Sequence, residues 1–547
     1  MAALYGMMME TQLLLITLLD HAARFHGDTE IVTRTSEGPI HRYTYRDAYA
    51  RAAKLAHALS GLGLVEGDRV ATLAWNSNRH FELYYAVPGI GAVCHTVNPR
   101  LFEGQLSYIL NHAEDRVVFA DPCFVPLLER LAPALRHVEA YVIMTDAAHM
   151  PHTTLPQALC YETLLEPHPE SYPWPALEEG AAASLCYTSG TTGNPKGVLY
   201  SHRSMMIYTM NICHGGAVGY GSEDVVMPVV PMFHVHAWGA PFAAALGGAK
   251  LVLPGAKLDP ESLHELFVGE RVTFSAGVPT VWSALIAYMR RTGKRIPSLK
   301  TVAIGGAPAS RAMVDAFELE FGIPVVHGWG MTETSASATN STLAARERSL
   351  PYEERVAYTL AQGRGRCFVD LKLVDEAGRA LPWDGTSAGE LLVRGPWIAR
   401  GYYRDEAASA AAVDKDGWLH TGDVAAIDAR GYVRIVDRKK DMIKSGGEWI
   451  SSIELENAAM GHPAVAEAAV IARPDPHWGE RPLLVVRSAN DAAVEAQDIL
   501  DFLAGKVAKW ALPSEVIFLA ELPHTATGKV AKRELRQRLL AGERPGA

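Results

Sequence analysis

Short apolar runs alternate with helical patterns over most of the chain. The segment DRVATLAWN (68–76) predicts a buried strand, and RHFELYYAVPGIGAV (79–93) predicts a helix that runs into a Gly/Pro break. Further short apolar strands end in glycine turns at 250–255, 272–277, 299–306 and 323–330. Apolar strands interleaved with helices are typical of parallel sheets that are covered on both faces. We therefore expect an α/β fold with mainly parallel sheets, and ligands near the turns after residues 276, 304 and 327.

The last hundred or so residues follow a different pattern. Predicted strands at 431–437, 465–474, 481–488 and 514–523 surround two helical patterns, near 452–461 and 494–507, which indicates a small α+β domain. The junction DRKKDMIKSGGEW (437–449) is dense in charge and glycine and poor in core residues, as a hinge would be. We expect an N-terminal domain over 1–436, a hinge over 437–442 and a C-terminal domain over 443–547.

Composition and charge exclude several classes of protein. The 547 residues carry 51 Lys and Arg against 61 Asp and Glu, whereas a general nucleic-acid binder shows a basic excess. The six cysteines are scattered without a CxxC pair, which favours free thiols in a reducing compartment over disulfides or a zinc site. No apolar run approaches the roughly 18 residues of a membrane helix. The run Leu13–Leu19 follows Glu10 rather than a basic leader, so we expect a cytoplasmic protein with no integral membrane segment.

The loop YTSGTTGNPKGV (187–198) carries the strongest chemical signal. Its glycines allow close backbone approach, its hydroxyls can donate hydrogen bonds, and Lys196 can neutralise charge, which together suit a polyphosphate. It is not a Walker loop, because Pro195 precedes the lysine and Gly197 follows it. The loop therefore predicts nucleotide chemistry of a less common type.

A second motif, GWGMTE (328–333), supplies other parts of a nucleotide site. Trp329 lies between two glycines at a strand end and can stack on a flat ring. Thr332 offers a phosphate donor and Glu333 a carboxylate for Mg²⁺, which prefers a carboxylate together with phosphate oxygens.

Three further candidate residues follow in the second half of the chain. Asp423 lies in a Thr-Gly-Asp turn and could accept hydrogen bonds from ribose hydroxyls, and Arg438 follows at the hinge. Lys529 lies in a glycine-containing loop between a predicted strand and a predicted helix. Each motif alone is more often a turn, a core residue or a solvated charge. Their occurrence together, in this order, favours the functional interpretation.

The motifs YTSGTTGNPKG, GWGMTE, HTGD, DRKKD and the C-terminal Gly-Lys resemble the core motifs of the adenylate-forming superfamily. That superfamily contains acyl-CoA synthetases, amino-acid adenylation domains and beetle luciferases, and the resemblance covers nearly the whole chain. The chain looks most like bacterial medium- and long-chain fatty acyl-CoA ligases, and it is similar to 3-methylmercaptopropionate-CoA ligases. This closer likeness rests on NPRLF (98–102), YILNHAED (108–115), VVPMFHVHAWG (229–239) and IKSGGEWISSIELEN (443–457).

The resemblance implies a fold and a set of roles. It implies a β-subdomain beside the parallel sheets and a mobile C-terminal domain that turns at Lys440. The loop over 188–196 would cover the β- and γ-phosphates of ATP, and Trp329, where many relatives carry Tyr, would stack on adenine. The implied catalytic residues are Lys529, Thr188, Glu333 and Lys196, with Glu333 and Thr188 at the metal. The implied nucleotide-binding residues are Thr188, Ser189, Gly190, Thr191, Thr192, Gly193, Lys196, Gly306, Ala307, Gly328, Trp329, Gly330, Met331, Thr332, Asp423, Arg438 and Lys529.

The substrate side centres on PMFHVHAWG. If this segment is a strand, His234 and His236 face the same way and could bind a metal, although no third ligand is apparent nearby. Amino-acid adenylation domains usually carry Asp at the position of His234, which argues against an amino-acid substrate. Trp238 matches a residue proposed to gate a fatty-acyl tunnel, the alternative being a core tryptophan. The resemblance implies an acyl pocket of His234, Val235, His236, Trp238, Gly277, Val278 and Gly305, and a CoA side of Lys444, Ser445, Gly446, Gly447, Glu448 and Trp449.

The implied reaction explains why cations are needed. Attack of a carboxylate on the α-phosphorus of ATP brings two anions together, which Mg²⁺, Lys196 and Lys529 would offset. The CoA thiol then attacks the adenylate carbonyl. We therefore expect an AMP-forming acyl-CoA ligase that acts on a medium- or long-chain fatty acid with ATP, Mg²⁺ and CoA. The resemblance to fatty acyl-CoA ligases further implies a homodimer. The alternatives are a short-chain or methylthio-acid CoA ligase, an enzyme that loads a separate carrier protein, a luciferase-like oxygenase and a non-catalytic binding protein.

Overall fold

The computed structural model describes residue 4 and residues 6–188, 194–214, 219–446, 448–489, 494–525 and 530–540. The chain forms two compact units, which are described one after the other. The first comprises residues 1–187, 197–226 and 231–256, and the second comprises residues 188–196, 227–230 and 257–547.

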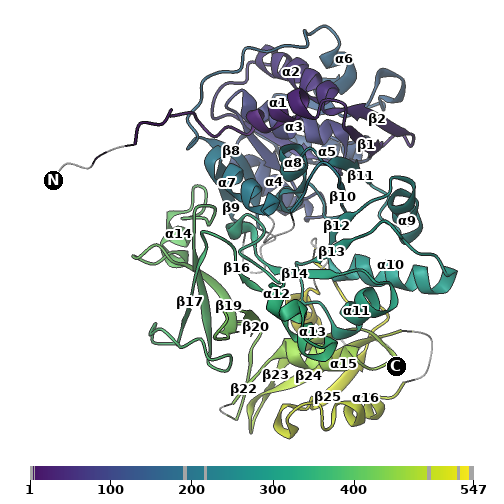
Figure 1. Ribbon diagram of the computed structural model, residues 1–547, viewed down its shortest axis with the longest axis vertical. Coiled ribbons are helices and arrows are strands. Elements are labelled where there is room, and N and C mark those ends of the chain that lie inside the picture. Colours follow the sequence, from purple (N-terminus) through teal and green to yellow (C-terminus); the bar gives the residue numbers. More distant parts are fainter. Residues whose placement is uncertain are drawn as a thin grey trace. The chain divides into compact units, whose positions relative to one another are not determined.

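The first unit contains a seven-stranded sheet of order β7-β6-β5-β3-β4-β8-β9, of which Figure 1 labels β8 and β9. Neighbouring strands run parallel except β8 and β9, which are antiparallel. The central strands are buried along their length, as expected for apolar strands covered on both faces. The strands are β3 (Arg69–Leu73), β4 (Val93–Thr96), β5 (Asp115–Ala120), β6 (Ala140–Ile143), β7 (Ala158–Cys160), β8 (Ala182–Tyr187) and β9 (Gly197–Ser201).

A second run of strands has the order β10-β11-β1-β2 and belongs to the same unit, except that Met227 and Pro228 at the end of β10 belong to the second unit. Only β1 and β2 are antiparallel among these pairs. The strands are β10 (Val225–Pro228), β11 (Lys250–Leu253), β1 (Glu30–Arg34) and β2 (Ile40–Thr44). The helices are α1 (Ile16–Phe25), α2 (Tyr45–Gly61), α3 (Asn78–Gly89), α4 (Glu103–Ala113), α5 (Val125–Leu131), α6 (Tyr161–Leu165), α7 (His202–Cys213) and α8 (Ala240–Gly247).

The second unit begins with strands in the order β16-β15-β14-β13-β12. β12, β13 and β14 run parallel, and β15 and β16 are added antiparallel. The strands are β12 (Phe274–Gly277), β13 (Thr301–Ile304), β14 (Val325–Trp329), β15 (Thr339–Asn340) and β16 (Arg364–Gly365). The helices of this part are α9 (Pro260–Gly269), α10 (Pro279–Thr292), α11 (Arg311–Asp315), α12 (Ala345–Arg348) and α13 (Tyr352–Leu360).

An antiparallel sheet of order β17-β18-β19-β20 follows and forms the expected β-subdomain. Its inward-facing residues, among them Leu391 and Val393, form a hydrophobic core that also includes Trp329. The strands are β17 (Asp370–Val374), β18 (Ala388–Arg394), β19 (Leu419–Ile427) and β20 (Val433–Arg438), and the helix α14 (Glu406–Ala412) lies between β18 and β19 in the chain.

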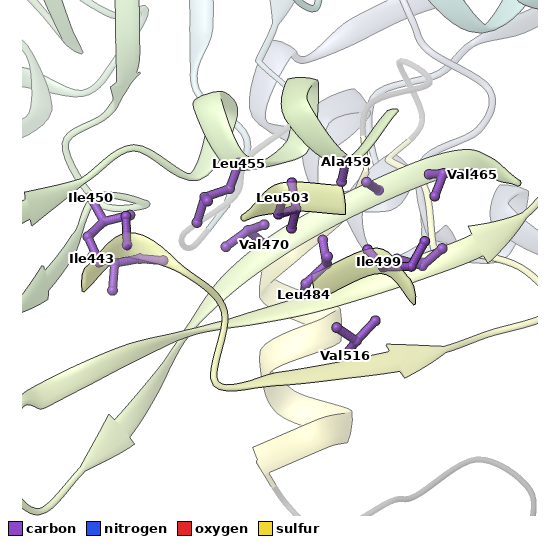
Figure 2. Close-up of a cluster of buried hydrophobic side chains, with 13 residues drawn as sticks. Ile443, Ile450, Leu455, Ala459, Val465, Val470, Leu484, Ile499, Leu503 and Val516 are labelled. Carbon is purple, nitrogen blue, oxygen red and sulfur yellow. The ribbon is translucent and has the colours of Figure 1, made fainter. Parts of the chain in front are cut away.

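The C-terminal part has its own sheet of order β22-β21-β24-β23, with β25 parallel to β24. Both faces of this sheet are buried, and alternate residues along its strands point to opposite faces. Val470 and Leu484 face a core that includes residues of α15 and α16 (Figure 2), whereas Ile471 and Leu483 face a core that includes Leu535 of α17. The elements are β21 (Ile443–Ser445), β22 (Glu448–Ile450), β23 (Val465–Asp475), β24 (Gly479–Ser488), β25 (Glu515–Phe518), α15 (Ser452–Met460), α16 (Ala496–Leu503) and α17 (Lys532–Leu540).

The structure confirms the predicted fold class: helix-covered, mainly parallel sheets, a β-subdomain and a smaller C-terminal part with its own sheet. The structure adds one element that the sequence did not predict: β21 and β22 form a hairpin directly after the expected hinge, and its Ile443 and Ile450 are buried in the C-terminal core (Figure 2). The boundaries at 436 and 442 stay a prediction. Within the described residues, no helix combines the length and apolarity that a membrane span requires.

Candidate active site

The phosphate-loop candidate lies between β8 and β9. Its two described ends are tied together: the Thr188 N–H donates to the Lys196 carbonyl at 2.9 Å, and the Lys196 N–H donates to Thr188 Oγ1 at 3.1 Å. These two bonds close the base of the loop and fix where the Lys196 side chain leaves the backbone. The predicted loop residues Ser189, Gly190, Thr191, Thr192 and Gly193 lie outside the described residues.

The structure brings Trp329, Asp423 and Arg438 together. The indole Nε1 of Trp329, at the end of β14, donates to Asp423 Oδ2 at 2.8 Å. Arg438 Nε lies 2.6 Å from Asp423 Oδ1, because Asp423 and Arg438 are cross-strand partners on β19 and β20. The Asp423 carboxylate is only 2% exposed, so both oxygens need partners, and these two residues supply them. The predicted ring platform and ribose clamp therefore form one connected group.

A second connected group is formed by Glu333, Tyr402 and Lys196. Glu333 lies in the 3₁₀ turn Thr332–Thr334 and is 5% exposed, and the Tyr402 hydroxyl donates to its Oε1 at 2.7 Å. The Lys196 ammonium lies 4.8 Å from the centre of the Tyr402 ring, within the range of a cation–π contact. Burial, and then the Glu333 charge, raise the pKa of Tyr402, so its hydroxyl stays protonated and can donate. Sequence reasoning missed Tyr402, because a tyrosine after a glycine carries no chemical signature of its own.

Close packing requires glycine at position 330 of the GWGMTE motif. A Cβ on Gly330 would lie 1.9 Å from the Ala336 carbonyl oxygen, so only glycine fits there. Gly328 and Met331 precede the 3₁₀ turn Thr332–Thr334. The Met331 N–H donates to Thr334 Oγ1 at 2.9 Å. After β13, Gly306 has a positive φ of 78°. Gly305, Gly306 and Ala307 follow the carboxyl end of β13, as the sequence predicted.

The donor set fits a magnesium ion that arrives with phosphates. Among the described residues, no group of three or more His, Cys, Asp or Glu side chains could hold a metal. Mg²⁺ is commonly bound by one or two carboxylates, waters and substrate phosphates rather than by an all-protein cage. A single buried carboxylate, Glu333, held through one oxygen by Tyr402, has that character. The expected hydroxyl ligand, Thr188, belongs to the same unit.

The segment Val235–Gly239 is not a strand, so the condition for a histidine pair on one face is not met. Val235, His236, Ala237 and Trp238 have φ values of 37°, 51°, 49° and 55°, which makes a left-handed turn without glycine until Gly239. L-residues adopt this region rarely, at roughly 1–2 kcal/mol each. A histidine metal pair, which the missing third ligand already disfavoured, therefore has no support, and no group of three or more possible ligands occurs among the described residues.

The His236 side chain holds this turn against β8 of the same unit. Its Nε2 is hydrogen-bonded to the Ser184 hydroxyl and lies 3.7 Å from Cys186 Sγ, both on β8. The rings of Tyr84 and Tyr200 meet it edge-on at 5.9 and 5.0 Å. Burial lowers the pKa of His236 to about 3, so the ring is neutral. Of the expected acyl-pocket residues, His234, Val235, His236 and Trp238 belong to the first unit and Gly277, Val278 and Gly305 to the second.

The hinge candidate is tied to the C-terminal helices. Asp437 Oδ2, in β20, accepts bonds from the Ser452 N–H at 2.5 Å and the Ser452 hydroxyl at 2.6 Å, and Ser452 is the first residue of α15. Lys532, the first residue of α17, donates to Ser452 Oγ at 2.6 Å and lies 2.6 Å from Glu456 Oε1. Glu456 also accepts the Val470 N–H at 2.7 Å. Burial lowers the pKa of Lys440, the expected hinge residue.

The expected CoA-side residues surround the β21–β22 hairpin. Trp449 is half exposed, and the Lys444 ammonium lies 5.0 Å from its ring centre. Ser445 is buried, Gly446 has a positive φ of 59°, and Glu448 begins β22. Gly447 and the expected catalytic Lys529 lie outside the described residues. The described residues that flank Lys529 are Thr525 on one side and Val530 on the other.

Comparison with known proteins is consistent with this site. A family model described as AMP-binding enzyme matches residues 19–403, and one described as AMP-binding enzyme C-terminal domain matches residues 454–529. The chain is 47% identical to a 3-methylmercaptopropionyl-CoA ligase of Ruegeria lacuscaerulensis, over 97% of the chain and 98% of the relative. It is 44% identical to a medium-chain-fatty-acid–CoA ligase of Ectopseudomonas oleovorans, over 97% of each. The crystal structure of the anthranilate CoA ligase AuaEII in complex with anthranoyl-AMP superposes with a TM-score of 0.85 at 25% identity, over 96% of this chain and 98% of that one.

Proposed function

The chain belongs to the AMP-binding enzyme family, and from this premise we propose that it is an AMP-forming acyl-CoA ligase for a medium- or long-chain fatty acid. The observation that carries the proposal is the joining of five predicted site residues, together with Tyr402, into two groups. Trp329, Asp423 and Arg438 form one group, and Glu333 and Lys196 meet at Tyr402 in the other. A nucleoside clamp and a paired carboxylate and cation are what a bound ATP requires.

In the first step the fatty acid carboxylate attacks the α-phosphorus of ATP, forming acyl-AMP and releasing pyrophosphate. Trp329 stacks on adenine, Asp423 and Arg438 hold the ribose, and Thr332 contacts the α-phosphate. Lys196 stabilises the negative charge that develops on the departing pyrophosphate, which lowers the barrier for a reaction between two anions. Mg²⁺ bound with Glu333 and Thr188 would neutralise further phosphate charge. Lys529 supplies the cation at the attacking carboxylate.

In the second step the CoA thiol attacks the acyl-AMP carbonyl, and AMP leaves as the carbon–sulfur bond forms. No enzyme nucleophile is needed. The buried thiols are unsuited to the task, because burial raises the pKa of Cys186 to about 12. We propose that the C-terminal domain turns at Lys440 between the steps, so that Lys529 withdraws and the hairpin around Lys444 and Trp449 meets CoA.

The nature of the acid is the part of the proposal that needs direct measurement. Likeness to the fatty acid ligase favours a medium- or long-chain acid, and likeness to the 3-methylmercaptopropionyl-CoA ligase favours a methylthio or short-chain acid as the second candidate. His234, in place of the aspartate that binds substrate amines in amino-acid adenylation domains, favours an acid without an α-amine.

The decisive experiment is product analysis with ATP, Mg²⁺ and CoA over acids from propionate and 3-methylthiopropionate to palmitate. Acyl-CoA and AMP in equal amounts support the proposal, and the acid with the highest kcat/KM names the substrate. ADP as product would refute the mechanism. Acyl-AMP that turns over with a phosphopantetheinyl carrier protein and not with CoA would favour the carrier-loading alternative.

We extend the proposal to a cytoplasmic homodimer, on the resemblance to fatty acyl-CoA ligases alone. Light scattering coupled to size-exclusion chromatography tests the oligomeric state, since a dimer would have twice the chain mass of 59.3 kDa. A monomer at micromolar concentration would contradict it.

A further inference from the structure

Tyr402 stands at the meeting point of two motifs that lie far apart in the chain. Its backbone position is fixed by α14: the Tyr402 N–H donates to Ser409 Oγ at 2.8 Å, and a Cβ on Gly401 would lie 2.8 Å from the same hydroxyl. A side chain at 401 would displace the Ser409 hydroxyl, so glycine there preserves its bond with the Tyr402 N–H. The Asp405 side chain accepts the Ala408 N–H at 2.9 Å and caps α14. The Tyr402 ring therefore leaves a well-anchored backbone.

The segment around Tyr402 holds Glu333 at two points. The Ala399 N–H donates to the Glu333 carbonyl at 2.8 Å, and the Tyr402 hydroxyl donates to Glu333 Oε1 at 2.7 Å. One bond fixes the backbone of the 3₁₀ turn and the other fixes the carboxylate. A hydrogen bond to one oxygen restricts rotation of the carboxylate and still allows its second oxygen to meet a cation.

The face of the same ring carries the Lys196 ammonium at 4.8 Å from its centre. Lys196 is anchored in turn through its backbone N–H, which donates to Thr188 Oγ1. A single side chain thus touches a carboxylate through its edge and a cation through its face. A tyrosine that only filled a gap in the core would need neither contact.

From this geometry we propose that Tyr402 is a positioning residue that presents Glu333 and Lys196 together to the metal-bound triphosphate. Its hydroxyl orients the Glu333 carboxylate, and its ring keeps the Lys196 ammonium beside it. The inference rests on the proposed function, because it assigns these two residues to ATP and its metal. Residues that hydrogen-bond to metal ligands in this way typically contribute 10–100-fold in metal affinity or activity.

The test measures nucleotide binding rather than catalysis. Calorimetry with a non-hydrolysable ATP analogue, with Mg²⁺ and with EDTA, gives the gain in affinity that the metal confers. In Tyr402→Phe, which keeps the ring and removes the hydroxyl, we expect that gain to fall about tenfold or more. Affinity in EDTA should change less than about threefold, since the Lys196 cation–π contact is retained. Tyr402→Leu, which also loses the ring, should weaken binding in EDTA as well.

Tyr403→Phe is the matched control, because it removes a hydroxyl from the adjacent residue, whose ring is contacted by Arg404 at 5.1 Å. It should bind like the wild type under both conditions. The inference is overturned if Mg²⁺ raises the nucleotide affinity of Tyr402→Phe as much as that of the wild type. It is also overturned if the variant loses affinity equally with and without Mg²⁺, as expected if Tyr402 were merely structural.

A double-mutant cycle guards against a general loss of folding. In a Glu333→Gln background the metal ligand charge is gone, so Tyr402→Phe should have no further effect on the metal gain. Effects that simply add would contradict the inference. Nucleotide binding needs neither acid nor CoA. If the wild-type protein binds the analogue with Mg²⁺ but makes no acyl-CoA, the proposed ligase activity is refuted and the role of Tyr402 in binding is not.

Discussion

Replacing Lys532 by methionine should loosen the C-terminal part of the protein far more than an ordinary surface mutation. The Lys532 ammonium lies 2.6 Å from Glu456 Oε1, and the two side chains are 15% and 14% exposed. Removing one partner of a buried ion pair costs roughly 3–5 kcal/mol, because the other charge is left without compensation. Glu456 keeps its bond from the Val470 N–H, so the lower end of that range applies, about 3 kcal/mol.

Hydrogen exchange measured by mass spectrometry on peptides from α15 and α17 reports this loss as a local opening free energy. A loss of about 3 kcal/mol corresponds to exchange faster by roughly 150-fold at pH 7. Arg538→Met is the matched control on the same helix. It breaks an exposed pair with Glu534, one turn away, and should cost less than about 0.5 kcal/mol.

The penalty should depend on pH in a defined direction. Burial raises the pKa of Glu456 above its ordinary value of 4.5, and Lys532 counters this shift. Without Lys532 the folded-state pKa of Glu456 rises further. At low pH the carboxyl is protonated in both the folded and the unfolded protein, so the loss of stability caused by Lys532→Met is smallest there. It grows as the pH rises through the wild-type folded-state pKa, which lies above 4.5, and levels off above the higher folded-state pKa of the variant. Exchange in Lys532→Met should therefore be closer to wild type at pH 5 than at pH 8.

Neutralising Glu456 supplies the refuting comparison. Adding Glu456→Gln to Lys532→Met should recover more than half of the lost free energy, because an amide oxygen can still accept the Val470 N–H without a buried charge. If the double variant exchanges as fast as Lys532→Met, or if the penalty is the same at both pH values, the buried charge is not the cause and the reasoning fails.

Three further predictions concern the site. Asp423→Ala leaves the Trp329 indole N–H and Arg438 without their shared acceptor, so the Kd for ATP measured by calorimetry should rise about tenfold or more, and an unchanged Kd would contradict the clamp. Lys440→Pro should keep acyl-AMP formation and lose thioester formation in separate half-reaction assays, and normal acyl-CoA synthesis by this variant would disprove a hinge at Lys440. Lys529→Ala should lose ATP-dependent adenylation and still convert preformed acyl-AMP to acyl-CoA, and surviving adenylation would show that another cation serves the first step.

The fold was largely predictable because its signals are local. The runs at 272–277, 299–306 and 323–330 became β12, β13 and β14, since parallel strands buried on both faces need nearly continuous apolar residues. The β21–β22 hairpin was missed because its core contribution rests on Ile443 and Ile450 within a run of charge and glycine. Two isolated apolar residues carry no periodicity from which a strand can be predicted.

The site was predictable in its members and not in their connections. Trp329 and Asp423 were both identified, but their direct bond joins residues 94 positions apart and depends on how β14 and β19 are placed. Tyr402 was missed because its significance comes entirely from what it touches. The turn at Val235–Trp238 could not be foreseen, since local propensity disfavours consecutive left-handed residues without glycine. Such strain persists only where surrounding contacts enforce it, as the His236–Ser184 bond does here.

Asp437 has a consequence for how the small domain could turn. The carboxylate lies on a strand of the β-subdomain and accepts two bonds from Ser452, the first residue of α15. Rotation about Lys440 would separate these partners, and the two bonds from Ser452 to the carboxylate would have to be replaced by bonds to water. The hinge would then not turn freely. These bonds would hold one angle, leaving it would cost their free energy, and the domain would spend little time between its resting positions.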